Sequence, residues 1–277
     1  MQTILITGAT SGIGLECAIQ LAPGTHLVLV GRDEARLQAA STRARAAGAA
    51  RTDVLQADFA SLASVRSLAT TVRNRYDAID ILINNAGAVF ASHTTTGDGY
   101  EATFAVNHLA PYLLTESVKP LLVSPESARI VITASTAHYR GNIDFDDLHY
   151  LRGYSTMKAY ARSKLANVLY ARSLAAELEQ SRVTVNAVHP GMVATGIWNN
   201  APWFAKPIVA AVKRVRMIPA ADGAHRLTAL ATDPALKETT GGYFEDGELR
   251  LPSMEAQDPI LGQRLREASD QLVGLHS

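Results

Sequence analysis

The chain has 277 residues, of which 47% are hydrophobic, and this suits one large α/β domain or two small ones. Its 26 basic side chains balance 26 acidic ones, so the charge gives no indication of a nucleic acid or another polyanion as partner. The single cysteine, Cys17, excludes an intramolecular disulfide and is typical of a reducing compartment. No apolar run approaches the roughly 20 residues that span a bilayer, and the start does not resemble a signal peptide. We therefore expect a cytoplasmic protein without stable membrane insertion.

Short apolar runs alternate with segments of helical period along most of the chain. The runs predict buried strands at residues 3–7, 26–30, 53–57, 79–83, 129–134, 182–188 and 242–245. The segments between them predict helices at residues 12–21, 34–47, 62–76, 98–122 and 156–179. Repeated strand–helix units imply parallel strands with right-handed crossovers. The expected fold is α/β: a single-domain Rossmann fold over residues 1–277, with a doubly wound, mostly parallel seven-stranded sheet and helices on both faces.

Two long connections interrupt this alternation, at residues 136–155 and 191–220. Connections at the carboxyl ends of parallel strands are where ligands bind in open α/β sheets. The second one is the expected substrate loop, and it carries Trp198, Trp203 and Phe204. We expect this loop to form a lid over an apolar substrate. The alternatives, in decreasing order of preference, are a helix that covers the sheet and a membrane-surface patch.

A glycine-rich turn follows the first predicted strand. Gly8, Gly12 and Gly14 allow a tight turn and a close approach to a pyrophosphate, with Thr10, Ser11 and Ile13 between them. The helix that follows offers unpaired N–H groups and the positive end of its dipole. An ordinary glycine-rich turn is the alternative, but the strand–turn–helix context favours a dinucleotide site.

Arg32 stands at the end of the second predicted strand, where a ribose contact is expected. An acidic residue there would accept from a free 2′-hydroxyl, whereas arginine offers a planar fork to a 2′-phosphate. Arg32 therefore favours NADP as cofactor, with NAD as the alternative. A solvated surface arginine is the competing interpretation.

Polar and small residues end the next two strands. Asp58 is a candidate acceptor for the adenine amino group, and the predicted cofactor contacts continue at Phe59, Asn85, Ala86 and Gly87.

Tyr160 and Lys164 lie four residues apart on a predicted helix, so their side chains share one face. A positive charge about 4 Å from a phenol favours the phenolate by roughly 4 kcal/mol at an effective dielectric of about 20, before desolvation.

Ser135 ends the fifth strand at the same edge of the sheet. Asn107 lies inside a predicted helix, where a polar residue usually faces solvent; the alternative is a local break that frees a carbonyl to hold a water.

These motifs together resemble the short-chain dehydrogenase/reductase family, of the one-domain type. The matching segments, in the family's order, are Thr7-Gly8-x-x-x-Gly12-x-Gly14, Asp58, Asn84-Asn85-Ala86-Gly87, Asn107, Ser135, Tyr160-x-x-x-Lys164 and Pro190-Gly191-x-x-x-Thr195.

The resemblance implies a role for each catalytic candidate. Tyr160 would transfer the substrate proton, and Lys164 would lower the phenol pKa and bind the nicotinamide ribose. Ser135 would hydrogen-bond the substrate oxygen, and Asn107 would position a water in the proton relay. Thr195 and the backbone near Val193 would hold the carboxamide, and Pro190 and Gly191 belong to the same cofactor-binding segment.

A narrower resemblance points to the retinol dehydrogenase and WW-domain oxidoreductase branch. It rests on Ser135-Thr136-Ala137-His138, residues 141–148, Ser163-Lys164-Leu165-Ala166-Asn167 and His189-Pro190-Gly191. Thr133-Ala134 precedes Ser135 where a second serine is common, so Thr133 and Thr136 remain minor rivals for the hydroxyl role.

The sequence thus predicts an NADP-dependent enzyme that interconverts an alcohol and a carbonyl on a lipophilic or bulky small molecule, as a monomer or homo-oligomer. A non-catalytic NADP-binding or sensing protein of the same fold is the alternative. No spacing suggests a metal site, so His108, His138 and His189 are expected to make structural hydrogen bonds. Asp144, Asp146 and Asp147 are expected to form solvated turns.

Overall fold

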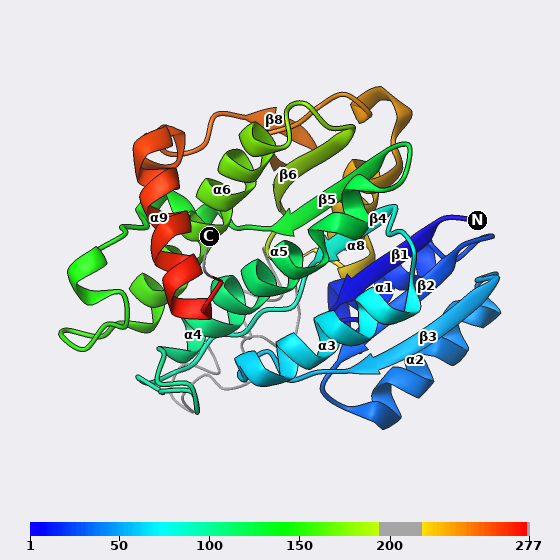
Figure 1. The fold of residues 1–277 in the computed structure, drawn as a ribbon, viewed down its shortest axis with the longest axis horizontal. Helices are drawn as coiled ribbons and strands as arrows, with labels where there is room; N and C mark the ends of the chain where they lie inside the picture. The colour runs from blue at the N-terminus through cyan, green and yellow to red at the C-terminus, as the bar shows by residue number, and fades with distance from the viewer. Residues whose placement is uncertain (194–217, 276–277) are drawn as a thin grey trace.

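The computed structural model describes residues 1–193 and 218–275, and within them one eight-stranded sheet carries helices on both faces (Figure 1). The strand order is β3-β2-β1-β4-β5-β6-β7-β8, with every neighbouring pair parallel except β7 and β8. The strands are β1 (Thr3–Thr7), β2 (His26–Gly31), β3 (Arg51–Gln56), β4 (Ile81–Asn84), β5 (Ala128–Thr133), β6 (Val183–His189), β7 (Tyr243–Glu245) and β8 (Glu248–Arg250).

The helices include two that the sequence pattern does not predict, α8 and α9. Within the described residues, the α-helices are α1 (Gly12–Gln20), α2 (Glu34–Ala46), α3 (Leu62–Arg75), α4 (Ala102–Phe104), α5 (Ala110–Val123), α6 (Thr156–Glu177), α8 (Ala220–Thr232) and α9 (Pro259–Val273). A π-helix, η1 (Ala105–Leu109), joins α4 to α5, and short 3₁₀ helices include η2 (Thr136–Arg140) and η3 (Phe145–Asp147). Among the described residues, none of these helices is long and apolar enough to cross a membrane.

The predicted seven-stranded sheet is wrong by one strand. β8 pairs antiparallel with β7 through a tight turn in which Asp246 and Gly247 have φ of 54° and 81°. An Asp-Gly pair with two positive φ angles is the preferred two-residue hairpin turn. The three residues of β8 are all exposed, so they lack the apolar run that marks a buried strand.

Alternate strand residues build two hydrophobic cores, one on each face of the sheet. On one face, residues such as Leu5 and Val28 pack with apolar residues of α3, α5 and α6. On the other face, residues such as Ile4 and Leu27 pack with apolar residues of α1, α2 and α8. Because both faces are covered, the central strands are continuously apolar, as expected for a parallel sheet.

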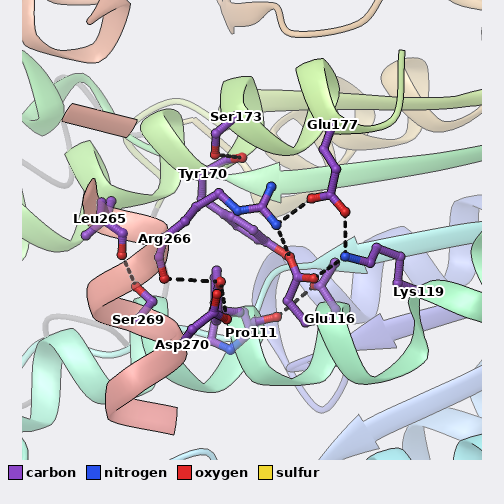
Figure 2. Close-up of polar contacts among 12 residues, drawn as sticks. Pro111, Glu116, Lys119, Tyr170, Ser173, Glu177, Leu265, Arg266, Ser269 and Asp270 are labelled. Carbon is purple, nitrogen blue, oxygen red and sulfur yellow. Dashed lines mark hydrogen bonds and ion pairs between the residues drawn. The ribbon is translucent and has the colours of Figure 1, made fainter. Parts of the chain in front are cut away.

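Helix α9 is tied to α5 and α6 by a cluster of charged side chains (Figure 2). Arg266 of α9 pairs with Glu116 of α5 at 3.3 Å and with Glu177 of α6. Lys119 pairs with the same two carboxylates. Tyr170 of α6 donates to Glu116 at 3.0 Å. These ion pairs therefore attach α9 to α5 and α6.

The chain reverses its direction across the sheet between β1 and β4. From β1 it builds outward to β2 and β3, and it then returns to add β4, β5 and β6 on the other side. Such a switch point leaves a crevice at the carboxyl ends of the two central strands, where nucleotides bind in doubly wound folds.

Candidate active site

A cleft of about 1210 Å³ runs along the carboxyl edge of the sheet and crosses the switch point. Most of the predicted site residues line this single cleft, although they come from segments far apart in the sequence. The lining residues that were predicted are Gly8, Thr10, Ser11, Gly12, Ile13, Arg32, Asp58, Phe59, Asn85, Ala86, Gly87, Ser135, Tyr160, Lys164, Pro190, Gly191 and Val193.

The turn after β1 has the backbone that the glycines were expected to supply. Gly8 and Gly12 have φ of 69° and 54°, which residues with a side chain rarely adopt. A Cβ on Gly8 would lie 3.0 Å from the Ala86 Cα, so the two strand ends meet without room for a side chain. Gly14 does not line the cleft: a Cβ there would lie 2.3 Å from the Gly8 carbonyl oxygen. Gly14 instead allows α1 to pack closely against the end of β1.

Thr7 and Asn85 join the ends of β1 and β4. The backbone N–H groups of Asn85 and Ala86 both donate to Thr7 Oγ1 at 3.0 Å, and Asn85 Nδ2 donates to the Thr7 carbonyl at 3.0 Å. These contacts hold the phosphate turn against the segment that follows β4. The residues present fit a dinucleotide, because the glycines leave a cradle that any Cβ at these positions would narrow.

Two arginines lie where the adenosine ribose is expected. Arg32 follows β2 and Arg36 lies one turn into α2, and both line the cleft. Asp33, between them, is not a lining residue; it caps α2 by accepting from the Arg36 N–H at 3.0 Å. Sequence reasoning missed Arg36, although its spacing of four residues from Arg32 is visible in the chain. Asp58 also lines the cleft, and its Oδ1 accepts from the Ala60 N–H at 3.0 Å.

Tyr160 and Lys164 lie on the cleft-facing side of α6. Lys164 is 4% exposed, and its Nζ lies 5.6 Å from the centre of the Tyr160 ring and donates to the Thr133 carbonyl at 2.9 Å. Burial lowers the pKa of this ammonium from 10.5 to about 8. Burial also raises the pKa of the Tyr160 phenol above its usual value of 10, and the polar Ser135 side chain opposes this shift.

The expected lowering of the phenol pKa by Lys164 is therefore not found in this structure. Desolvation by burial is the largest influence on the pKa of the Tyr160 phenol, and it raises that pKa. Ser135 and Tyr160 line the same cleft at the carboxyl edge of the sheet, where both were expected. Thr133 and Thr136 also line the cleft, and Thr133 Oγ1 is buried without a hydrogen-bond partner among the described residues.

Asn107 does not face solvent, and the helix is irregular at this residue, which agrees with the alternative of a local break. It is 1% exposed and lies in the π-helix η1, an irregularity of the kind that its poor helix propensity suggested. Its amide group donates to the Ala88 carbonyl at 3.0 Å and to Ser163 Oγ at 3.0 Å, and its Oδ1 accepts from the Ala88 N–H at 2.7 Å. A Cβ on Gly87 would lie 3.2 Å from this Oδ1, so the glycine makes room for the amide.

Two of the three histidines make the structural hydrogen bonds expected of them. His138 Nδ1 lies 2.7 Å from the Ser135 carbonyl, and Nε2 accepts from the Ser253 N–H at 3.2 Å. His108 contacts Asn167 and Ser269. His189 differs, because its buried Nδ1 lacks a partner among the described residues and it lines the cleft.

The predicted aspartate turns are present, but one of them is not solvated. Asp144 accepts from the Asp146 N–H at 3.1 Å, and Asp147 accepts from the Leu151 N–H at 2.7 Å. Asp147 is only 9% exposed. Cys17 is fully buried, and burial raises its pKa, as expected for a packing residue.

The rim of the cleft beside Tyr160 carries residues that sequence reasoning missed. Met157 lies three residues before Tyr160 on α6, and Tyr139 and Arg140 belong to η2. Thr195 and most of the expected substrate loop at residues 191–220 lie outside the described residues, and so do its three aromatic side chains.

Comparison with known proteins identifies relatives over the whole chain. The short chain dehydrogenase family model matches residues 2–203. Retinol dehydrogenase 13 of Homo sapiens is 36% identical, covering 100% of this chain and 86% of the relative. A protein of Streptomyces sp. (strain C5), provisionally named daunorubicin C-13 ketoreductase DnrU, is 42% identical, covering 99% of this chain and 93% of the relative. A solved variant of actinorhodin polyketide ketoreductase with NADPH has a TM-score of 0.70 at 26% identity, covering 88% of this chain and 95% of that one.

These matches confirm the predicted family and its retinol dehydrogenase branch, and they agree with the Rossmann-type sheet and its glycine turn. The relatives named as a dehydrogenase and a ketoreductase support an NAD(P)-dependent oxidoreductase that acts on alcohols or carbonyls. The chain belongs to the short-chain dehydrogenase/reductase family.

Proposed function

We propose that this protein is an NADP-dependent oxidoreductase that interconverts a bulky, lipophilic carbonyl compound and its alcohol, with Ser135, Tyr160 and Lys164 as the catalytic residues. The observation that carries the proposal is the convergence of a serine hydroxyl, a phenol and a buried ammonium in the cleft that begins at the glycine turn. A nucleotide sensor would not require this set of side chains.

The residues divide the chemistry between them. When bound, the nicotinamide cofactor supplies or accepts the hydride. Ser135 Oγ hydrogen-bonds the substrate oxygen, where negative charge develops during reduction. Tyr160 donates the proton to that oxygen, or removes it in the oxidation direction. Lys164 holds a positive charge near the phenol and would bind the nicotinamide ribose, while Asn107 orders the backbone of Ala88.

The cofactor preference for NADP rests on Arg32 and Arg36. Both arginines line the cleft after β2, and the acidic Asp33 between them caps α2 and lies 3.7 Å from Arg36 Nε. A 2′-phosphate can accept charge-assisted hydrogen bonds from such a pair. The other predicted cofactor-binding residues that line the cleft would supply the remaining cofactor contacts. Gly14 does not line the cleft but allows α1 to pack closely against Gly8.

The preference for a lipophilic substrate rests on the apolar side chains near Tyr160. Met157 lies three residues before Tyr160 on α6 and is 52% exposed, and Val89 and Phe90 also line the cleft. Apolar linings with a few polar groups are typical of small-molecule sites. The names of two relatives, retinol dehydrogenase 13 and daunorubicin C-13 ketoreductase, support the same class of substrate.

The proposal is tested by following NADPH oxidation with matched pairs of small and bulky aldehydes, ketones and quinones. We expect turnover with the bulky apolar members and at least about tenfold lower kcat/KM with the small ones, a difference of roughly 1.4 kcal/mol. Tight NADPH binding without turnover across the whole panel would instead support the nucleotide-sensing alternative.

A further inference from the structure

Behind the catalytic lysine lies a buried chain of hydrogen bonds that the proposed mechanism does not use. The Thr133 carbonyl accepts from Lys164 Nζ at 2.9 Å and from Asn167 Nδ2 at 3.1 Å. Lys164 and Asn167 are each 4% exposed, and Thr133 is 8% exposed. The oxygen that holds the ammonium is thus held in turn by the side chain of Asn167.

The direction of the chain follows from the donors and acceptors. Because Asn167 Nδ2 must face the Thr133 carbonyl, its Oδ1 faces His108 Nδ1 at 3.3 Å and can only accept. Burial lowers the pKa of His108 to about 4, so the neutral ring carries one proton, and that proton belongs on Nδ1. His108 Nε2 is then an acceptor for the Ser269 hydroxyl, at 3.0 Å. The Leu265 carbonyl competes for this hydroxyl proton (Figure 2).

The π-helix η1 explains how two adjacent polar residues both reach this region. Asn107 and His108 are each 1% exposed. Asn107 donates to Ser163, which precedes Lys164 on α6, and His108 contacts Asn167, which follows it. The segment of α6 that carries Lys164 is therefore held from both sides by one turn of the neighbouring helix.

We propose that Asn167, oriented by His108, is a positioning residue that fixes the Thr133 carbonyl and through it the ammonium of Lys164. Asn167 is not among the residues that line the cleft, so it acts through Lys164 rather than on the substrate. This inference rests on the proposed function, in which Lys164 contacts the cofactor. The competing explanation is that Asn167 stabilises the core without affecting the site.

The test compares Asn167→Leu with a matched control, Asn186→Leu. Asn186 is 3% exposed, and its amide group also bridges backbone groups, donating to Thr239 O at 2.6 Å and accepting from Gly242 N at 2.9 Å. Both variants lose buried hydrogen bonds and should melt at lower temperature. We expect Asn167→Leu alone to lower kcat about tenfold and to weaken NADPH binding several-fold, in line with one lost contact near a charged group.

A second pair of variants tests the direction of the chain. In His108→Asn the amide nitrogen can replace Nδ1 as the donor to Asn167, whereas His108→Leu removes that donor. We expect His108→Asn to stay within about threefold of the wild-type kcat, and His108→Leu to resemble Asn167→Leu, at a cost of about tenfold. The double variant Asn167→Leu/His108→Leu should be no slower than Asn167→Leu, because both changes remove one coupled contact.

The proposal is overturned if Asn167→Leu binds NADPH and turns over like Asn186→Leu. It is also overturned if His108→Asn and His108→Leu have the same kcat. This comparison still tests the proposal if Asn167→Leu does not fold. NADPH dissociation constants, measured by fluorescence, separate this proposal from the proposed function. A wild-type protein that binds NADPH but reduces nothing contradicts the function, while the ratios of dissociation constants still decide the role of Asn167.

Discussion

At the scale of single residues, Lys164 carries a charge where burial opposes it. Its pKa falls to about 8, so the ammonium is mostly protonated at neutral pH and costs the fold up to roughly 3 kcal/mol relative to a solvated lysine. A group that destabilises the fold in this way is typical of a functional site. The destabilisation by the Lys164 ammonium is consistent with a catalytic role for this charge.

We expect Lys164→Met to abolish turnover while raising stability at pH 7 by up to roughly 3 kcal/mol. Between pH 8 and 10.5 the unfolded wild-type chain binds a proton that the folded chain has lost, so wild-type stability rises with pH in this window. The advantage of the variant should therefore shrink from pH 8 to pH 10.5. Denaturant unfolding across this range checks it, with the exposed Lys237→Met as control. A variant less stable than wild type at pH 7 would contradict the expectation.

A second residue-scale prediction concerns cofactor choice. Arg32→Asp removes a donor to the 2′-phosphate and adds a repelling charge, so the ratio of kcat/KM for NADPH to that for NADH should fall about 10- to 100-fold. Arg73→Asp makes the same charge change on α3, away from the lining residues, and should leave the ratio unchanged. Equal ratios for the two variants would remove the support that Arg32 gives to NADP.

At the scale of elements, α9 depends on contacts between residues far apart in the chain. Arg266 is 19% exposed and faces Glu116, which is 8% exposed. We expect Arg266→Met to destabilise the protein by roughly 2 kcal/mol, less than a fully buried pair would cost, because Lys119 still compensates Glu116. Arg182→Met breaks an exposed pair with Glu126 and should cost under about 1 kcal/mol. Equal unfolding midpoints for the two variants would show that the cluster does not secure α9.

The same helices show why some elements could be predicted and others not. The first seven strands could be predicted because each is a short apolar run in the sequence. Their observed bounds agree with the predicted ones to within about two residues. The irregularity at Asn107 had a local signal, because asparagine disfavours a helix interior, but the inward turn of its side chain depends on Ala88 and Ser163. The docking of α9 has no local signal, because Arg266 and Glu116 are 150 residues apart.

At the scale of the whole molecule, the sheet order brings distant motifs to one edge. The glycine turn after β1 and Asn85 after β4 meet only because the chain reverses between these strands. The alternation of strands and helices predicted this edge as the site, since ligands bind at switch points. It did not predict the pKa of the Tyr160 phenol, because burial is set by the packing of the entire cleft rather than by the neighbouring lysine.

In the proposed mechanism, Tyr160 transfers a proton within this cleft during carbonyl reduction. The most direct test measures NADPH affinity and single-turnover reduction of a bulky ketone in the wild type and in Tyr160→Phe. We expect the NADPH dissociation constant to stay within about twofold, while the rate falls about 10²- to 10⁴-fold, as for the loss of a general acid. A Tyr160→Phe variant that reduces the ketone at close to the wild-type rate would contradict the account.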